Sequence, residues 1–278
     1  MDSKTRPKGI LAAGGVLDRI VDARAQRVFD LKLAHPVNEL VIRAQEAPPC
    51  PRYSMSNALS QRARTNIVAE IKHRSPSKGV IREEFDPVAI AASYENAGAA
   101  ALSVLTEEDF FGGSLSHLRA VRERVGLPLL RKDFHFDEYQ LHEALAAGAD
   151  AVLLIVAILE DQLLADLIAL ASDLKLDALV EVHSAAEMGR AVEAGARLIG
   201  VNNRDLTTFT VDLEISEHLA RVAPTEAVLV SESGIHTGQD LKRLKQAGYN
   251  AFLVGEHFMR ADDPGEALRQ LVSSAESE

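Results

Sequence analysis

Short hydrophobic runs alternate with amphipathic segments along the chain from residue 67 onward. Eight runs rich in β-branched and aliphatic residues predict strands, at 67–72, 101–106, 128–132, 151–156, 178–182, 198–202, 227–231 and 251–255. Their ends are spaced by about 26 residues on average, which is the length of one strand, one helix and two loops. The pattern therefore predicts a regular succession of strands and helices.

Helix-capping residues mark the segments between the strands as helices. Ser184 and Glu187 have the spacing of a capping box, and Thr237 is expected to cap a helix that ends at Gly248. Nearly continuous apolar strands, each followed by a helix, indicate a parallel sheet covered by helices. No nucleotide-binding fingerprint follows any strand, so the sequence favours an α/β fold built as a single (β/α)8 TIM barrel over an open doubly wound sheet.

The segment before the first strand predicts an amphipathic helical extension. Apolar residues recur there at three- and four-residue spacing, at Leu17, Val21, Ala25, Val28 and Leu31. A second helix is expected after Pro36, then a proline-rich connector at 44–54 and a short helical turn at 54–61. We expect an N-terminal helical extension at 1–60 that packs on a catalytic barrel at 61–278.

The charge balance and the cysteine count narrow the range of possible partners and cellular locations. The chain has 30 Lys and Arg against 41 Asp and Glu, and this net charge of −11 argues against nucleic-acid and membrane partners. Cys50 is the single cysteine, so no internal disulfide can form, which fits a reducing compartment. The N-terminus lacks the apolar core of a signal peptide and no run approaches a membrane span, so a cytoplasmic location is expected.

Polar residues gather where the predicted strands end, which in such barrels is the active-site face. They are Glu70, Lys72, Thr106, Lys132, Asp133, Glu181, Asn202, Arg204, Ser231, Glu232, Ser233 and Glu256, and the fourth strand alone ends in apolar residues. Lysines and glutamates are seldom buried without partners. Their convergence on one rim therefore predicts a functional site.

Two glycines near the last two strand ends, Gly234 and Gly255, suggest a phosphate cradle. Glycine lets backbone N–H groups approach an anion closely, and the last two loops of a barrel commonly bind phosphate. The alternative that these glycines only serve tight turns stays open. A phosphorylated small molecule in an acidic protein needs local cations, and Lys72, Lys132 and Arg204 can supply them.

Other chemistry receives less support from the sequence. Five histidines lie just beyond strands, at positions 73, 135, 183, 236 and 257. They lack the H-x-x-x-H spacing of a metal site, and we expect them to be solvated loop residues without a catalytic role. Phe110, Phe111 and Phe134 are the expected apolar walls of the site or, equally, packing at the barrel mouth. No metal is expected.

Seven phrases occur in a fixed order between about residues 65 and 260: AEIKHRSPSKG, LSVLTEEDFFGGS, LLRKDF, LVEVHS, IGVNNRDL, SESGI and FLVGEHFM. Together they closely resemble the indole-3-glycerol phosphate synthase family of tryptophan biosynthesis. The resemblance implies ring closure, decarboxylation and dehydration of 1-(2-carboxyphenylamino)-1-deoxyribulose 5-phosphate, with no metal or organic cofactor. The enzyme is expected to be a monomer or a weak homo-oligomer.

The resemblance also implies roles for individual residues. Lys132 resembles the general acid of ring closure, Glu181 the acid/base of dehydration, and Lys72 the lysine that grips the substrate carboxylate. The catalytic group is completed by Glu70, Asn202 and Ser233, of which Glu70 and Asn202 orient the lysines and the substrate. The substrate contacts implied are Ser75, Phe134 and Arg204, and the phosphate ligands are Ser233, Gly234, Gly255 and Glu256.

Two expectations about charge follow. Burial and two lysines on one rim should lower the pKa of each lysine, which suits an acid, while Glu70 and Glu181 oppose that effect. The carboxylate of Glu256 is expected to point away from the phosphate. The alternative functions are another phosphate-binding barrel enzyme, such as phosphoribosylanthranilate isomerase, or a non-catalytic phosphosugar-binding barrel.

Overall fold

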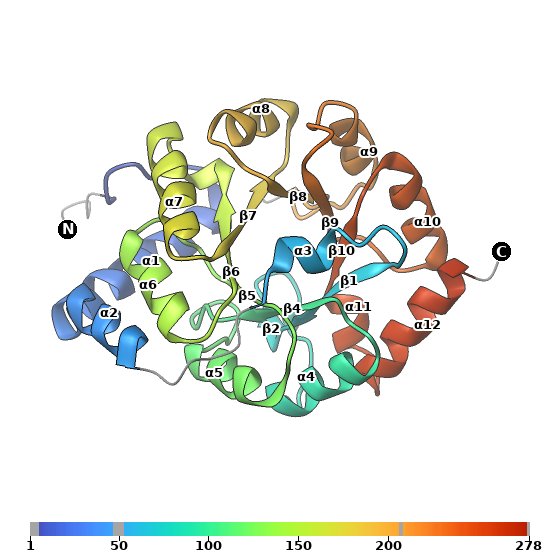
Figure 1. Ribbon diagram of the computed structural model, residues 1–278, viewed down its shortest axis with the longest axis horizontal. Coiled ribbons are helices and arrows are strands. Elements are labelled where there is room, and N and C mark those ends of the chain that lie inside the picture. Colours follow the sequence, from blue (N-terminus) through green and yellow to red (C-terminus); the bar gives the residue numbers. More distant parts are fainter. Residues whose placement is uncertain (1–5, 47–52, 206–207, 277–278) are drawn as a thin grey trace.

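Eight parallel strands form a closed barrel in the computed structural model, which describes residues 6–46, 53–205 and 208–276 (Figure 1). Cys50 and most of the proline-rich connector lie outside the described residues. The strands are β1 (Asn66–Ile71), β4 (Ala101–Leu105), β5 (Leu129–Lys132), β6 (Ala151–Ile155), β7 (Asp177–Val182), β8 (Leu198–Asn202), β9 (Val228–Glu232) and β10 (Ala251–Val254). Each strand pairs with its neighbours in the chain, and β10 pairs with β1 to close the ring. The predicted (β/α)8 TIM barrel is confirmed.

Helices surround the barrel and separate successive strands (Figure 1). They are α4 (Pro87–Asn96), α5 (Leu115–Arg124), α6 (Glu138–Ala146), α7 (Asp161–Asp173), α8 (Ala185–Glu193), α9 (Glu214–Ala220), α10 (Gly238–Ala247), α11 (Glu256–Met259) and α12 (Pro264–Glu276), with a 3-10 turn η1 (Val156–Ile158) after β6. β1, β4 and β6 are buried along their whole length, as expected for parallel strands that helices cover on the outside of a barrel.

The predicted helix caps are only partly confirmed. Thr237 caps α10 in a capping box with Asp240, and Gly248 ends that helix in a left-handed conformation. Ser184 accepts a hydrogen bond from the backbone N–H of Glu187 at the start of α8, as predicted. The second half of that box differs, because the Glu187 carboxylate accepts from the N–H of His183, one residue earlier.

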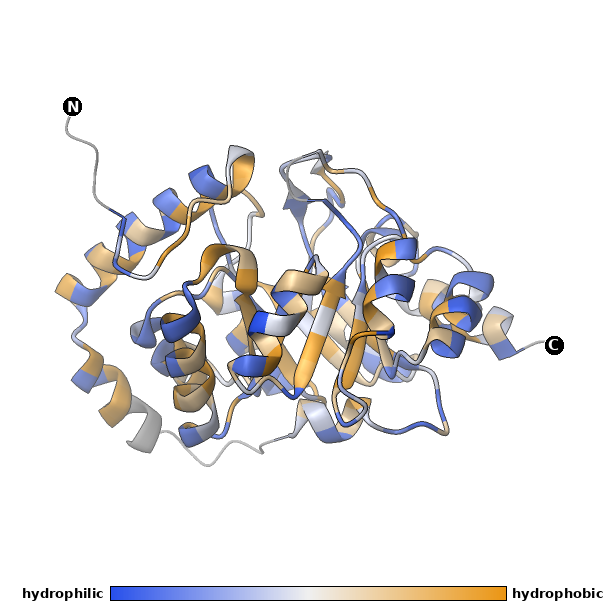
Figure 2. Ribbon diagram, turned by 90° about the horizontal axis from the view of Figure 1, so that it is seen from above, coloured by the Kyte–Doolittle hydropathy of each residue, from blue (hydrophilic) through white to orange (hydrophobic). Residues whose placement is uncertain are grey.

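The predicted N-terminal extension consists of α1 (Gly15–Ala34), α2 (Val37–Glu46) and α3 (Met55–Leu59). Helices α1 and α3 lie at opposite ends of the barrel (Figure 2). Helix α3 covers the amino end, where Ser56 hydrogen-bonds Asp177, the first residue of β7, at 2.6 Å. Helix α1 lies at the carboxyl end, where its first turns reach the cavity described below. Along the described ranges, no helix is both long and apolar enough to cross a bilayer.

A buried ion network ties α1 to the barrel. Arg24 of α1 is 1% exposed and donates to Asp133 at 2.8 Å and to Glu108 at 2.9 Å. Arg131 of β5 donates to the same Asp133 oxygen at 3.1 Å and to Glu143 at 2.7 Å. Burial alone would raise the pKa of Asp133, but the two guanidinium groups outweigh it and lower that pKa to about 2. The extension is therefore docked by charge pairs beside Lys132, the neighbour of Asp133.

Replacing Arg24 by methionine is expected to lower the free energy of unfolding by about 3 kcal/mol, because one partner of a buried charge network is lost. Arg27, one turn further along α1, provides the matched control. Its ion pair with Asp109 is 43% exposed on the arginine side, so Arg27→Ala is expected to cost less than about 1 kcal/mol. Urea denaturation of both variants measures the difference. Equal losses would contradict the assignment of Arg24 as the anchor of α1.

Candidate active site

A cavity of about 450 Å³ opens where the carboxyl ends of the strands meet. The residues to which the family resemblance assigns a role all lie on its wall: Glu70, Lys72, Ser75, Lys132, Phe134, Glu181, Asn202, Arg204, Ser233, Gly234, Gly255 and Glu256. Thr106 and Ser231, which the sequence also placed on the rim, are buried and are not among the lining residues. Val16, Leu17 and Ile20 of α1 complete the wall with apolar surface. The structure therefore brings the predicted residues together from six strands and their loops, and the extension forms part of the same enclosure.

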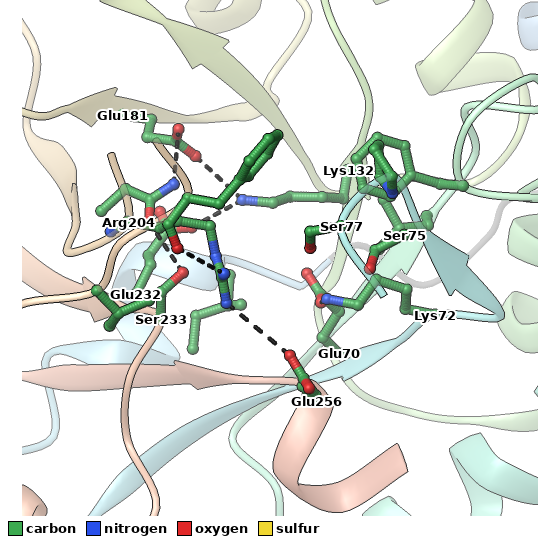
Figure 3. A pocket seen from close by; sticks show the side chains of 18 of the residues that line it. Glu70, Lys72, Ser75, Ser77, Lys132, Glu181, Arg204, Glu232, Ser233 and Glu256 are labelled. Atoms are coloured by element: carbon green, nitrogen blue, oxygen red, sulfur yellow. Dashed lines mark hydrogen bonds and ion pairs between the residues drawn. The ribbon is translucent and has the colours of Figure 1, made fainter. Parts of the chain in front are cut away.

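Lys132 is the central cation of the cavity (Figure 3). It ends β5, its side chain is 14% exposed, and its Nζ lies 2.7 Å from Glu232 and 3.2 Å from Glu181. Both carboxylates are buried at the ends of β9 and β7. Because each strand end is fixed by the barrel ladder, the three groups are held without help from mobile loops.

A chain of hydrogen bonds extends from this cation along the rim. Asn202 donates to Glu181 at 3.1 Å through its amide nitrogen. Its carbonyl oxygen accepts from the Ser233 hydroxyl at 2.9 Å and from the Arg204 backbone N–H at 3.1 Å. Asn202 thus fixes the orientation of the Glu181 carboxylate and connects it to the loop after β9, which bears Ser233 and Gly234.

The expectation of a lowered lysine pKa is wrong for Lys132 in this structure. Burial does disfavour its charged form, but the carboxylates of Glu232, Glu181 and Glu70 outweigh that effect and hold the pKa of Lys132 above its ordinary value. Burial alone would raise the pKa of Glu181, yet Lys132 and His183 lower it below its ordinary value. The resting cavity therefore holds a protonated lysine beside an ionised Glu181.

Glu232 lines the cavity and contacts Lys132, although the sequence assigned it no role. The predicted strand stopped at residue 231, whereas β9 extends through Glu232 and so fixes its side chain toward Lys132. Burial raises the pKa of Glu232 well above its ordinary value, and repulsion by Glu181 and Glu70 adds to it although Lys132 acts in the opposite direction. Of the two carboxyl groups that share Lys132, Glu232 is the one that retains its proton more readily.

A second lysine stands across the cavity from Lys132. Lys72, the residue after β1, is paired with Glu70, as their two-residue spacing predicts. The S-P-S-K-G segment that follows lies in a hairpin of β2 (Arg74–Ser75) and β3 (Gly79–Val80). Gly79 takes a left-handed conformation at its turn, with φ of +67°. The hairpin brings Ser75 and a further cation, Lys78, to the cavity wall.

Two aromatic rings form an apolar side of the cavity. Phe111 and Phe134 both line it, with ring centroids 6.1 Å apart, whereas Phe110 is not among its lining residues. The buried Glu107 carboxylate shapes the loop of Phe111 by accepting from the backbone N–H groups of Phe110 at 2.8 Å and Phe111 at 3.0 Å. The two rings give the cavity an aromatic wall.

The two glycines of the expected phosphate cradle are required for different reasons. Ser233 and Gly234 are both left-handed, with φ of +67° and +82°, and such strain in a non-glycine residue is typical of functional sites. Gly255 has an ordinary φ of −125°. A Cβ there would lie closer than 3.0 Å to the Glu70 carboxylate, so Gly255 gives that carboxylate its space.

Arg204 and Glu256 face each other at the edge of the cavity (Figure 3). The Glu256 carboxylate lies 3.9 Å from the Arg204 guanidinium and 3.0 Å from that of Arg260. Glu256 therefore lines the cavity with its carboxylate close to two guanidinium groups. An anion that binds beside Arg204 must compete with this ion pair.

His183 departs from the expectation of a solvated loop histidine. Its side chain is 15% exposed, with Nε2 lying 3.3 Å from Glu181 and Nδ1 3.2 Å from Glu187. Burial alone would lower the pKa of His183, but these two carboxylates raise it to about 10. His135 is also buried, and there burial lowers the pKa to about 3.

His183→Gln is expected to lower the free energy of unfolding by about 2 kcal/mol at pH 6, because an imidazolium between two carboxylates is lost. A histidine whose folded pKa is raised stabilises fully below its unfolded pKa of about 6.5 and loses that contribution as pH rises through about 10. The difference between the native chain and the variant should therefore shrink from pH 6 to pH 10. Thermal unfolding across this range measures it, with the exposed His218→Gln as control; a pH-independent difference would contradict it.

The fold and the site define a class of protein: a (β/α)8 barrel enzyme with lysines and carboxylates arranged for acid–base chemistry at the carboxyl ends of its strands. The family model described as indole-3-glycerol phosphate synthase matches residues 17–271. A relative of that name from Carboxydothermus hydrogenoformans is 47% identical over 263 residues, covering 92% of this chain and 99% of the relative. The chain belongs to the indole-3-glycerol phosphate synthase family, and it is a carboxy-lyase of tryptophan biosynthesis.

Solved structures of other proteins share the barrel alone. The 3-hexulose-6-phosphate synthase of Salmonella typhimurium is 15% identical with a TM-score of 0.61, covering 77% of this chain and 99% of that one. Thiamine phosphate pyrophosphorylase from Pyrococcus furiosus is 17% identical with a TM-score of 0.58, covering 78% and 98%. At such identities the likeness concerns the fold.

Proposed function

We propose that this cavity closes the indole ring of indole-3-glycerol phosphate with Lys132 as general acid and Glu181 as the acid/base of dehydration. The observation that carries this assignment is the position of the Lys132 Nζ between two buried carboxylates, 2.7 Å from Glu232 and 3.2 Å from Glu181. The substrate is 1-(2-carboxyphenylamino)-1-deoxyribulose 5-phosphate, which carries a carboxylate and a phosphate on either side of its reacting carbonyl.

In the ring-closing step, the ring carbon that bears the carboxylate attacks the sugar carbonyl carbon. The carbonyl π electrons move to oxygen, which takes a proton from the Lys132 ammonium. A raised pKa keeps Lys132 charged before this step, so the proton is available at neutral pH. The electron pair for the new carbon–carbon bond is supplied through the ring by the anilino nitrogen, which becomes an iminium.

Decarboxylation follows because the iminium accepts an electron pair. The bond to the carboxylate breaks, carbon dioxide leaves, and the pair restores the aromatic ring. In the last step the new hydroxyl leaves as water while the adjacent methylene loses a proton. Glu181 is ionised at rest and can move one proton from the methylene to the departing hydroxyl, so dehydration consumes no net proton.

The remaining residues of the site bind and orient the substrate in this proposal. Lys72 binds the substrate carboxylate while Glu70 holds that lysine in place, and the aromatic ring lies against Phe134 near Ser75. The phosphate binds to backbone N–H groups at Ser233, Gly234, Gly255 and Glu256, with Arg204 released from Glu256 to contact it. Asn202 hydrogen-bonds both Glu181 and the Ser233 hydroxyl and so fixes their relative positions.

The proposed chemistry is tested by following product fluorescence and carbon dioxide release from the anilino-ribulose phosphate in one reaction. We expect one carbon dioxide per indole product. Phosphoribosylanthranilate, the isomerase substrate, should give no turnover, which separates this function from the isomerase alternative. Substrate-dependent thermal stabilisation without product would instead support a binding protein.

We further propose that the enzyme acts in the cytoplasm as a monomer or weak homo-oligomer, with no nucleic-acid partner.

A further inference from the structure

The interior face of β8 carries a residue without a side chain directly beside the Lys132–Glu232 pair. Gly200 pairs in register with Glu181 of β7 and with Val230 of β9. It shares a face with Asn202, two residues further on, whose side chain reaches Glu181. Its φ lies outside the left-handed region, so backbone conformation does not require glycine here.

The space above Gly200 is filled by a carboxylate. A Cβ at this position would lie closer than 3.0 Å to Oε1 of Glu232 and 3.3 Å from a methyl carbon of Leu179. Oε2 of Glu232 accepts from Lys132, whereas Oε1 is buried and has no hydrogen-bond partner among the described residues. The carboxylate thus lies between the Lys132 ammonium and the bare backbone of β8.

We propose that Gly200 is a positioning residue of the active site, because the missing side chain creates the space in which the Glu232 carboxylate contacts Lys132. This inference rests on the proposed role of Lys132 in ring closure. Gly200 touches no substrate in this assignment and acts only through Glu232.

The two neighbours of the absent side chain differ in how far they can move. Leu179 is completely buried on β7 and belongs to the packed barrel core, where displacement is costly. The Glu232 carboxylate is the far end of a flexible side chain and borders the cavity. A methyl group at position 200 should therefore displace the carboxylate from Lys132 and leave the barrel intact.

Gly200→Ala is expected to lower kcat by about 100-fold, as expected for loss of a group that supports a general acid, with KM changed by less than about threefold. The melting temperature should stay within a few degrees of the native value, because the clash is relieved at a flexible side chain. Gly189→Ala is the matched control, since a Cβ at Gly189 in α8 would meet nothing within 4 Å. That variant should retain native activity.

A double-mutant cycle separates positioning from a general packing effect. In a Glu232→Ala background the clashing carboxylate is gone, so adding Gly200→Ala should change kcat by less than about threefold. The pH dependence of kcat should also shift in Gly200→Ala, because the ionisation of Glu232 is separated from Lys132. A structural role would predict a large loss of melting temperature in both backgrounds and an unchanged pH profile.

Three results would overturn the proposal: native-like kcat in Gly200→Ala, an equal further loss when it is added to Glu232→Ala, or failure of the double variant to fold. If Gly200→Ala alone fails to fold while the double variant folds, the clash with Glu232 is supported. Lys132→Ala is measured in parallel. Retained turnover in that variant would refute the proposed function, whereas its loss together with an active Gly200→Ala would refute only the role of Gly200.

Discussion

Lys132→Ala is expected to lower kcat by about 10³-fold with a small change in KM. The substrate carboxylate and phosphate still meet Lys72 and the loops after β9 and β10, so binding survives. The proton donor for the carbonyl oxygen is lost, and Glu181 and Glu232 are left facing each other without the cation that both contact. Single-turnover kinetics should show neither carbon dioxide nor indole product at the native rate.

The control for this variant is Lys242→Ala, which should retain native kinetics. Lys242 lies on the outer helix α10 and is not among the residues that line the cavity. Lys132→Arg keeps the charge but cannot act as the acid, because an arginine guanidinium is not deprotonated in proteins. Arginine at this position should therefore fail to rescue the rate. Full activity in Lys132→Arg would show that charge alone, and not proton donation, is required.

Glu181→Gln is expected to lower the rate of indole formation by about 10²- to 10³-fold while leaving ring closure and decarboxylation largely intact. The glutamine preserves the shape of the side chain and its contact with Asn202, but it cannot accept the methylene proton. With substrate labelled in the carboxyl group, a single turnover should release carbon dioxide in a fast phase that precedes the indole fluorescence.

The exposed Glu193→Gln in α8 serves as the control and should keep both signals synchronous. Parallel loss of carbon dioxide release and indole formation in Glu181→Gln would contradict an assignment to dehydration. That result would instead assign Glu181 to ring closure, where it would act through its contact with Lys132. The pair of variants therefore separates the two acid–base roles by the order in which products appear.

The barrel could be predicted from the sequence because its signals are local. Each strand is an apolar run of a few residues and each helix carries its own caps, so the count of eight needs no information on tertiary contacts. The hairpin at Ser75 was missed because its strands are two residues long and have no hydrophobic alternation. The strand predicted at 227–231 ends one residue before β9 does, so the sequence did not place Glu232 within a strand.

The charge state of the site could not be predicted, because it depends on distances. The predicted strand ends placed two lysines and several glutamates on one rim. Whether the pKa of a lysine there is raised or lowered depends on how close the nearest carboxylate lies. The 2.7 Å contact with Glu232 reverses the expected shift of the Lys132 pKa. The same holds for Gly255, whose ordinary φ and closeness to Glu70 appear only in three dimensions.

The closure of the ring by β1 and β10 has a consequence for the order in which the protein acquires activity. Residues Asn66 to Ala69 pair with residues Ala251 to Val254, so Glu70 and Lys72 meet the loop of Gly255 only after nearly the whole chain has been synthesised. Contacts this distant in sequence are slow to form, because the entropy of closing the intervening chain is lost first. The first strand must therefore wait for its second neighbour in the sheet until the last strand arrives, and catalysis begins only when the barrel closes.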